Sequence, residues 1–286
     1  MHRESNYTYY HFMNSQTNPI GVFDSGVGGL SVLRAMREQM PAENIIYFGD
    51  QRHVPYGPRP MEQIQSFSEG ITKFLLTRNS KLIVVACNTA SAAALTYLRQ
   101  RFPDLIFVGM EPAVKPAAET TKTGKVGVLA TPATFQGALY ASVVERFGAG
   151  VELFQHTCPG LVSQIENGDL DSNVTRAILK NALGPMLEKN IDTVVLGCTH
   201  YPFVIPLIEK IVGDDVRVID PAPSVAKQAK RLLEAEGIRN SSITKGNIQY
   251  FTSGGVSVVE AVLPKLLQEH VTVKPVLWKD DVELII

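Results

Sequence analysis

The stretches Leu82-Ile-Val-Val-Ala-Cys87-Asn88-Thr89 and Thr193-Val-Val-Leu-Gly-Cys198-Thr199-His200 decide the predicted fold. Each is a continuous apolar run that ends in a cysteine, followed at once by small hydrogen-bonding residues. Continuous apolar runs are typical of strands that are buried on both faces, as in parallel sheets covered by helices. Because two such runs lie about 110 residues apart, they predict two equivalent places in an α/β protein.

The rest of the chain repeats this alternation of short apolar runs and longer amphipathic segments. Predicted strands cover residues 20–23, 45–48, 82–86, 106–108, 126–129, 151–154, 193–196, 216–219 and 248–251. Predicted helices cover residues 30–40, 61–78, 90–102, 134–147, 172–189, 224–236 and 257–267. The pattern indicates mostly parallel sheets with helices on both faces. In such folds ligands bind at the carboxyl ends of the strands, where both cysteines are expected to lie.

A second pair of similar segments suggests an internal duplication. Gly21-Val-Phe-Asp-Ser25 and Gly127-Val-Leu-Ala-Thr131 are separated by about the same interval as the two cysteines. We therefore predict two similar, doubly wound lobes related by a pseudo-twofold axis, with the active site in the cleft between them. The predicted first lobe comprises residues 19–110 and 223–286, the second comprises residues 111–222, and residues 1–18 form an N-terminal extension.

Composition narrows the class of partner. The 286 residues include 27 Lys and Arg against 28 Asp and Glu, so no net charge recruits nucleic acid. The expected partner is a small molecule. No apolar run approaches the roughly 20 residues of a membrane span, and residues 1–18 lack a signal-type apolar stretch, which predicts a cytoplasmic protein. Three cysteines are too few for a disulfide framework.

The glycine-rich segment Asp24-Ser-Gly-Val-Gly-Gly-Leu-Ser31 joins a predicted strand to a predicted helix. Such a turn can present backbone N–H groups to an anion. It is neither a P-loop nor a dinucleotide fingerprint, because the Gly-Lys-Ser/Thr ending and the third glycine are absent. The alternative is a tight turn in which Asp24 is a local cap.

Each cysteine has a reactive and an inert interpretation. Cys87 precedes Asn88 and Thr89 at a helix start, where the helix dipole favours a thiolate. His200 lies two residues after Cys198 and could hold its proton, or simply cap a helix. Either cysteine could be inert packing, which is also our interpretation of Cys158. A zinc site is disfavoured because these residues lack chelating pairs at short spacing.

Three weaker signals remain. The rigid turn Pro55-Tyr56-Gly57-Pro58 could offer free N–H groups to a carboxylate or be only a turn. Thr131 and Thr134 open a helix and need no ligand as N-caps. Glu166 would, on sequence alone, be a solvated charge at a helix end.

The chain resembles the glutamate racemases, a branch of the pyridoxal-free aspartate/glutamate racemase family, in four motifs that occur in order between Ile20 and Phe251. They are Asp24-Ser25-Gly-Val-Gly-Gly-Leu-Ser31, Pro55-Tyr56-Gly57, Ala86-Cys87-Asn88-Thr89-Ala90-Ser91 and Leu196-Gly-Cys198-Thr199-His200-Tyr-Pro202. The resemblance implies two α/β lobes around the active site. It also implies racemisation of L- and D-glutamate without a cofactor or metal, to supply D-glutamate for peptidoglycan.

The resemblance further implies roles for individual residues. Cys87 would abstract the α-proton of D-glutamate and Cys198 that of L-glutamate, with Asp24 assisting the first, and His200 with Glu166 assisting the second. The remaining implied residues bind substrate: Asp24, Ser25, Asn88, Thr89, Thr131, Thr134, Thr199 and His200 at the amino-acid head, and the Pro55-Tyr56-Gly57 turn at the side-chain carboxylate.

Inversion at carbon explains why such a site needs two thiols. A single base would return the proton to the face it left, and no lysine signature for a pyridoxal Schiff base is visible. An amino-acid-binding module, an aspartate racemase, a related decarboxylase and a zinc hydrolase remain alternatives. The resemblance also leads us to expect a homodimer and a muramyl cell-wall precursor as activator, and Met13 is a second candidate start.

Overall fold

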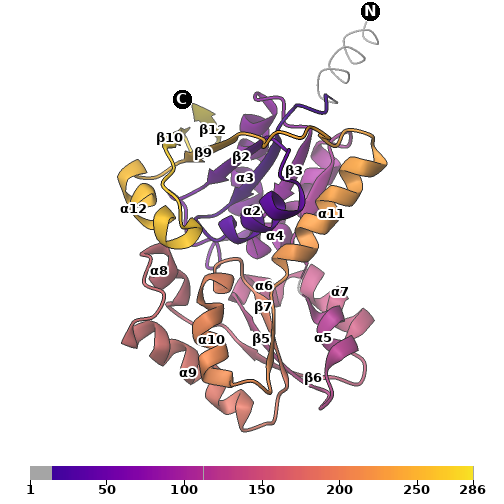
Figure 1. Ribbon diagram of the computed structural model, residues 1–286, viewed down its shortest axis with the longest axis vertical. Helices are drawn as coiled ribbons and strands as arrows, with labels where there is room; N and C mark the ends of the chain where they lie inside the picture. The colour runs from indigo at the N-terminus through magenta and orange to yellow at the C-terminus, as the bar shows by residue number, and fades with distance from the viewer. Residues whose placement is uncertain (1–14, 112, 286) are drawn as a thin grey trace, which may run out of the picture.

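The computed structural model describes residues 15–111 and 113–285 of the chain. Two α/β lobes lie one above the other, each built on its own parallel sheet (Figure 1). The start-codon question at Met1 and Met13, and most of the predicted N-terminal extension, fall outside the described residues.

The larger lobe contains a six-stranded parallel sheet of order β10-β9-β2-β1-β3-β4. Its strands are β1 (Ile20–Asp24), β2 (Ile45–Gly49), β3 (Leu82–Val85), β4 (Phe107–Gly109), β9 (Ile248–Thr252) and β10 (Val273–Pro275). Its helices are α2 (Leu30–Gln39), α3 (Met61–Leu76), α4 (Asn88–Arg101), α11 (Ala222–Ala235) and α12 (Val256–Leu267). The C-terminal strands thus return to the sheet that begins at residue 20.

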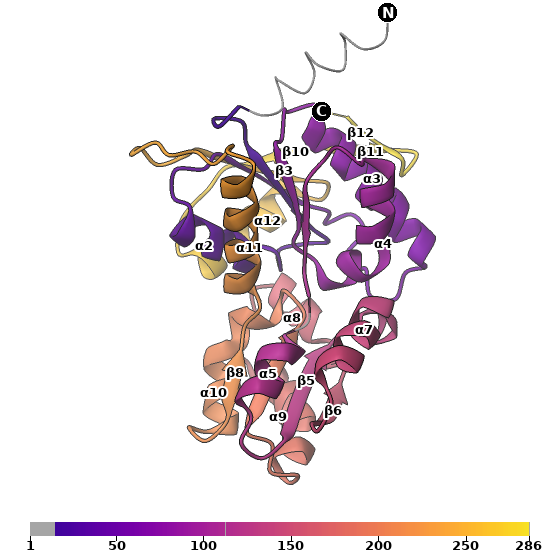
Figure 2. The same cartoon turned by 90° about the vertical axis from the view of Figure 1, so that its right-hand side faces the viewer.

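Burial explains the apolar runs. Every residue of β1, β2 and β3 is buried. Alternate side chains enter two cores: Val22 and Val84 pack with α2, α11 and α12, whereas Phe23 and Val85 pack with α3 and α4. Figure 2 shows these helices on the two sides of the upper sheet.

The smaller lobe contains a four-stranded parallel sheet of order β6-β5-β7-β8. Its strands are β5 (Lys125–Ala130), β6 (Glu152–His156), β7 (Thr193–Gly197) and β8 (Arg217–Ile219). Its helices are α5 (Val114–Thr120), α6 (Pro132–Gln136), α7 (Ala138–Phe147), α8 (Leu161–Glu166), α9 (Asn173–Leu187), the 3-10 turn η1 (Tyr201–Val204) and α10 (Ile205–Val212).

The two sheets share one strand order. In the larger sheet β2-β1-β3-β4 are neighbours, and in the smaller one β6-β5-β7-β8 are, so β1 corresponds to β5 and β3 to β7. These are the strands of the two segment pairs that suggested a duplication, and the prediction of two similar α/β lobes is confirmed. The lobe boundaries at residues 110 and 222 and the pseudo-twofold axis stay predictions.

Four features differ from the prediction. The helix α5 and the strand β10 were not among the predicted elements. The helix expected over residues 134–147 is two helices, because Gly137 is extended (φ −71°, ψ 138°) between α6 and α7. A C-terminal antiparallel hairpin of β11 (Leu277–Lys279) and β12 (Glu283–Ile285) was not expected, since three-residue strands leave little periodic signal. It packs against α3.

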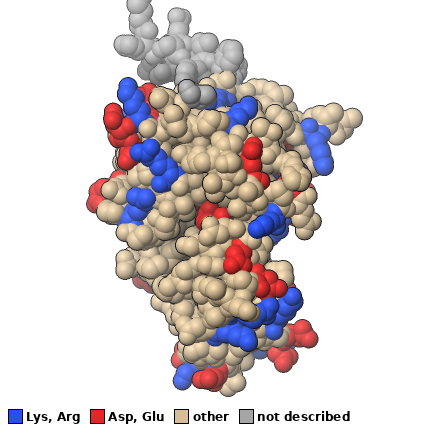
Figure 3. Space-filling model, turned by 90° about the vertical axis from the view of Figure 1, so that its left-hand side faces the viewer, with Lys and Arg blue, Asp and Glu red and all other residues tan. Residues whose placement is uncertain are grey.

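The surface agrees with the balanced composition. On the face in Figure 3, acidic and basic side chains are interspersed rather than gathered by sign. None of the helices in the described part of the chain is long and apolar enough to cross a membrane.

Candidate active site

The two cysteines line one small cavity between the lobes. Cys87 follows β3 and Cys198 follows β7, so equivalent strand ends of the two sheets bring both thiols there. The cavity is lined by Ser25, Pro55, Tyr56, Gly57, Cys87, Asn88, Thr89, Thr131, Val162, Cys198, Thr199 and His200. All but Val162 were predicted from the sequence, and an aliphatic residue on α8 gave no signal of its own.

Cys87 is the N-cap of α4. Its Sγ accepts a hydrogen bond from the Ala90 N–H at 3.3 Å and lies 3.8 Å from Ser25 Oγ. Burial nevertheless raises the pKa of the Cys87 thiol, and the charge of Asp24 raises it further. The N–H contact at the helix start lowers the pKa of this thiol, as expected, but desolvation outweighs it.

Asp24 joins the two lobes through a hydrogen bond. Its carboxylate accepts from the Gly26 N–H at 2.7 Å and from Thr199 Oγ1, in the other lobe, at 3.0 Å. The local-cap interpretation is thus confirmed, and a cross-lobe contact is added. Burial raises the pKa of Asp24 although His200 and these donors oppose the change. The hydrogen bonds of Asp24 go to Gly26 and Thr199 rather than to Cys87.

His200 lies between Cys198 and Glu166. Its Nδ1 is 3.7 Å from Cys198 Sγ, and its Nε2 contacts Glu166 Oε1. Burial lowers the pKa of His200, but the contacts with Cys198 and Glu166 outweigh it and raise that pKa well above its usual value. The pKa of Glu166 changes in the opposite direction. Burial raises this pKa, but the contact with His200 outweighs burial, so the pKa of Glu166 is lowered. The pair is an imidazolium and a carboxylate at neutral pH, with Cys198 beside the cation.

Glu166 is not the solvated charge that its sequence position suggested. It is mostly buried, and it accepts from the Val27 N–H at 2.9 Å and from Gln51 Nε2 at 2.8 Å, both in the other lobe. The glycine-rich turn therefore does bind an anion through a backbone N–H, and that anion is a carboxylate of the same chain. A Cβ on Gly26 would lie 2.0 Å from Glu166 Oε1, which is why the turn needs glycine there.

Hydroxyl and amide groups form the rest of the cavity wall. Thr89 Oγ1 is 3.0 Å from Thr131 Oγ1, which is 2.9 Å from Thr134 Oγ1, so a row of hydroxyls crosses between the lobes. The side-chain amide of Asn88 is buried with neither its Nδ2 nor its Oδ1 hydrogen-bonded. Buried amides without partners are costly, so Asn88 is suited to meet a polar ligand.

The cavity is too small for a substrate. It measures about 20 Å³, whereas a single water needs roughly 10–15 Å³ by this measure, so an amino acid does not fit. The contacts Asp24–Thr199, Thr89–Thr131 and Glu166–Gln51 all join the lobes across it. The lobes or their side chains must separate before a ligand enters.

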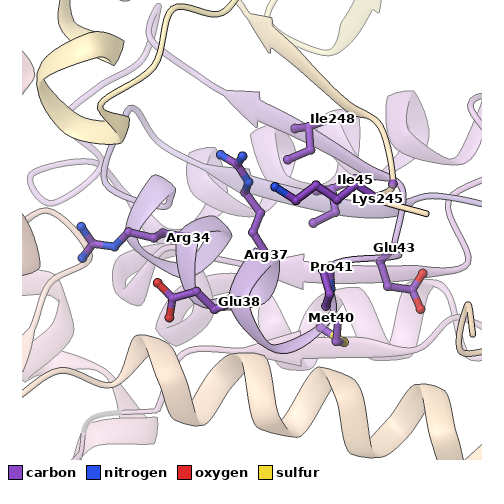
Figure 4. A pocket seen from close by; sticks show the side chains of 10 residues that line it. Arg34, Arg37, Glu38, Met40, Pro41, Glu43, Ile45, Lys245 and Ile248 are labelled. Carbon is purple, nitrogen blue, oxygen red and sulfur yellow. The ribbon is translucent and has the colours of Figure 1, made fainter. Parts of the chain in front are cut away.

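Other features do not form an alternative centre. Cys158 is buried among apolar side chains, which raises its pKa to about 12 and supports the packing interpretation. A cavity of about 290 Å³ beside α2 is surrounded by Arg34, Arg37, Lys245, Glu38 and Glu43 (Figure 4), charges of both signs without a thiol. In the described part of the chain no group of three or more His, Cys, Asp or Glu is arranged to hold a metal ion.

Comparison with known proteins gives one consistent result. The Asp/Glu/Hydantoin racemase family model matches residues 20–229. A glutamate racemase of Pseudomonas paraeruginosa is 48% identical over 254 residues, which cover 89% of this chain and 96% of that protein.

Solved structures agree. A glutamate racemase isoform of Bacillus anthracis has a TM-score of 0.82 at 35% identity, covering 94% of this chain and 100% of its own. Escherichia coli glutamate racemase, solved in complex with L-glutamate and the activator UDP-MurNAc-Ala, has a TM-score of 0.80 at 31% identity, covering 94% and 99%.

Proposed function

The chain belongs to the Asp/Glu/hydantoin racemase family, and from this premise we propose that it interconverts L- and D-glutamate by proton transfer at two cysteines, without a cofactor. It is an amino-acid racemase of the glutamate type. The observation that carries the two-cysteine proposal is the shared cavity, into which equivalent strand ends of the two lobes deliver one thiol each.

The two thiols have opposite electrostatic surroundings. Cys87 is desolvated beside Asp24, which raises the pKa of its thiol, whereas Cys198 Sγ lies 3.7 Å from His200 Nδ1, a group that can hold or return a proton. We propose that with L-glutamate a Cys198 thiolate removes the α-proton and the Cys87 thiol delivers a proton to the opposite face. The products are D-glutamate, a Cys198 thiol and a Cys87 thiolate, which is the state that D-glutamate needs.

The charge of Asp24 bears directly on the protonation of Cys87. A protonated Asp24 donates toward its surroundings and adds no negative charge beside a Cys87 thiolate, whereas an ionised Asp24 opposes that thiolate. We propose that Asp24 passes a proton to and from the first half of the site, and that His200 does so for the second.

The amino-acid head binds to the hydroxyl and amide wall. We propose that the amino and carboxylate groups of the amino-acid head contact Ser25, Asn88, Thr89, Thr131, Thr134 and Thr199. Asp24 and His200 lie at the edges of this binding surface. The unpaired amide of Asn88 supports this assignment, because a ligand supplies the hydrogen bonds that it lacks. The Pro55-Tyr56-Gly57 turn lies on the same cavity and offers backbone N–H groups to the side-chain carboxylate.

Serine substitution tests the two-thiol mechanism. Cys87→Ser and Cys198→Ser are each expected to lower kcat for racemisation by at least about a thousandfold, because a hydroxyl is a far weaker acid than a thiol. Circular dichroism follows the reaction with glutamate alone. Cys158→Ser is the matched control and should retain activity. Near-normal turnover in either active-site variant would sink the mechanism.

Substrate choice is tested separately. Both enantiomers of glutamate and of aspartate should be assayed in deuterated water, where glutamate product acquires an α-deuteron and unreacted substrate acquires little. Turnover of aspartate at the rate of glutamate would contradict the glutamate assignment, and rapid exchange without inversion would contradict two bases.

Partners and location complete the proposal. We place the enzyme in the cytoplasm as a homodimer that supplies D-glutamate for peptidoglycan, and equilibrium sedimentation tests the dimer. A muramyl cell-wall precursor is proposed as activator, since the E. coli relative was solved with UDP-MurNAc-Ala. An interlobe cavity of about 680 Å³ has Arg99, Lys115 and Arg146 in its lining against one acidic residue, Glu111, and this excess of positive charge supports an anionic ligand. Unchanged kcat/KM with saturating precursor would refute activation.

A further inference from the structure

The C-terminal hairpin reaches a buried carboxylate near the active site. Trp278, the only tryptophan of the chain, is on β11 and is 6% exposed. Its ring is seated on α3 at Gly70, where a Cβ would lie 2.7 Å from Cζ3. The lack of a side chain at residue 70 therefore admits the indole, whose Nε1–H donates to Asp50 Oδ1 at 2.7 Å.

Asp50 gathers four hydrogen-bonding groups from three parts of the chain. Oδ1 accepts from Trp278 Nε1 and from Ser253 Oγ at 2.6 Å. Oδ2 accepts from Tyr56 Oη at 2.6 Å and is 2.9 Å from His53 Nδ1. The carboxylate is completely buried, so these four groups replace water around its charge. Losing one donor leaves that charge less compensated and frees the segments it joins.

Tyr56 carries this network to the cavity. Its ring is 1% exposed, and the Pro55-Tyr56-Gly57 turn lines the cavity that holds Cys87 and Cys198. His53 reinforces the link, because its ring stacks on Phe67 with centroids 3.9 Å apart and lies 5.3 Å from the ring of Trp278. A continuous path therefore runs from the hairpin through Asp50 to the turn.

We propose that Trp278 is a positioning residue that holds the Pro55-Tyr56-Gly57 turn for substrate binding, acting through Asp50 and Tyr56. The proposal rests on the proposed function, in which this turn receives the side-chain carboxylate of glutamate. It assigns the hairpin a role in affinity rather than in proton transfer, because no atom of the hairpin lines the cavity.

Trp278→Phe tests the link while keeping an aromatic ring on Gly70. A hydrogen bond to a charged group is worth roughly a tenfold change in an equilibrium constant. We expect KM to rise about five- to tenfold in both directions and kcat to change less than about twofold. Because the enantiomers have equal free energies, kcat/KM must fall equally in both directions, which checks the measurement internally.

A double-mutant cycle separates positioning from general destabilisation. In the Tyr56→Phe background, which cuts the path, Trp278→Phe should raise KM by less than about twofold further. Tyr140→Phe, the control, removes a phenol hydroxyl from the other lobe. Its effect on KM and that of Trp278→Phe should be additive. In the wild type, saturating glutamate should shift the emission of the single tryptophan with a midpoint at KM.

Three results would overturn the proposal: a folded Trp278→Phe variant with unchanged KM, full additivity with Tyr56→Phe, or wild-type emission that ignores saturating glutamate. Wild-type protein that does not racemise glutamate would instead overturn the proposed function, so the two failures are distinguishable.

Discussion

Replacing Gly28 by alanine is a steric test of the His200 site. Gly28 is not among the glycines with positive φ, so alanine is compatible with its backbone. The added Cβ, however, would lie 2.4 Å from His200 Nδ1 and 2.6 Å from Thr199 Oγ1. The substitution therefore acts through contact with two residues of the opposite lobe.

The expected magnitude follows from these distances. To reach an ordinary contact of about 3.4 Å, His200 Nδ1 must retreat by about 1 Å. Its contact with Cys198 Sγ is 3.7 Å, so a displacement of that size changes the geometry of the contact. A misplacement of about 1 Å costs on the order of a hundredfold in rate. Overpacking between the lobes should also destabilise the protein by about 1–3 kcal/mol.

The assay compares kcat/KM for both enantiomers with urea unfolding on the same preparations. We expect Gly28→Ala to lose about a hundredfold in kcat/KM while remaining folded. Gly184→Ala is the matched control, because its Cβ meets nothing within 4 Å in α9. It should stabilise by about 0.5–1 kcal/mol with normal activity. Activity of Gly28→Ala within threefold of wild type would refute the steric reasoning.

Two further predictions concern charges. Gln51 donates to Glu166 and helps lower the pKa of that carboxyl group, so Gln51→Met should raise the pKa of Glu166. The Glu166 carboxylate, which stabilises the His200 cation, is then protonated at a higher pH. The acid limb of the kcat/KM profile should therefore move to higher pH. Gln39→Met is the control, and an unmoved limb would contradict the prediction. Although burial raises the pKa of Asp192, hydrogen bonds lower it to about 2, below the roughly 3.9 of an unfolded chain. The contribution of Asp192 to the free energy of unfolding is therefore present above about pH 4 and lost as pH falls toward 2. In urea unfolding, the loss of stability caused by Asp192→Asn should be smaller at pH 3 than at pH 7. An equal loss at both pH values would contradict this.

The fold could be predicted because buried parallel strands leave a strong signal. The runs ending at Cys87 and Cys198 are almost entirely apolar because helices cover both faces of their sheets, and the polar residues after each run must then lie at the carboxyl edge of its sheet. Local chemistry also identified the cap at Asp24. Each of these inferences used contacts within a few residues of the chain.

The inferences that failed or were missing depend on contacts between distant segments. Residue type alone made Glu166 a solvated charge, because its partners Val27 and Gln51 lie more than a hundred positions away. The thiolate expected at Cys87 followed from the helix start, but desolvation by burial and the charge of Asp24 raise the pKa of the thiol. Trp278 gave no signal, since its acceptor lies 228 positions earlier.

The duplicated fold also explains how two similar strand ends became unequal. Asp24 reaches from the larger lobe to Thr199 in the smaller one, and Glu166 reaches back from the smaller lobe to Val27 and Gln51. The two carboxylates thus cross the cleft in opposite directions, and each depends on donors that it has only while the cleft is closed. Without these cross-lobe contacts Glu166 would lose two of its three donors, which help to lower its pKa beside His200. The unequal environments of the two thiols therefore depend on contacts across the cleft, which a pair of symmetric strand ends alone would not provide.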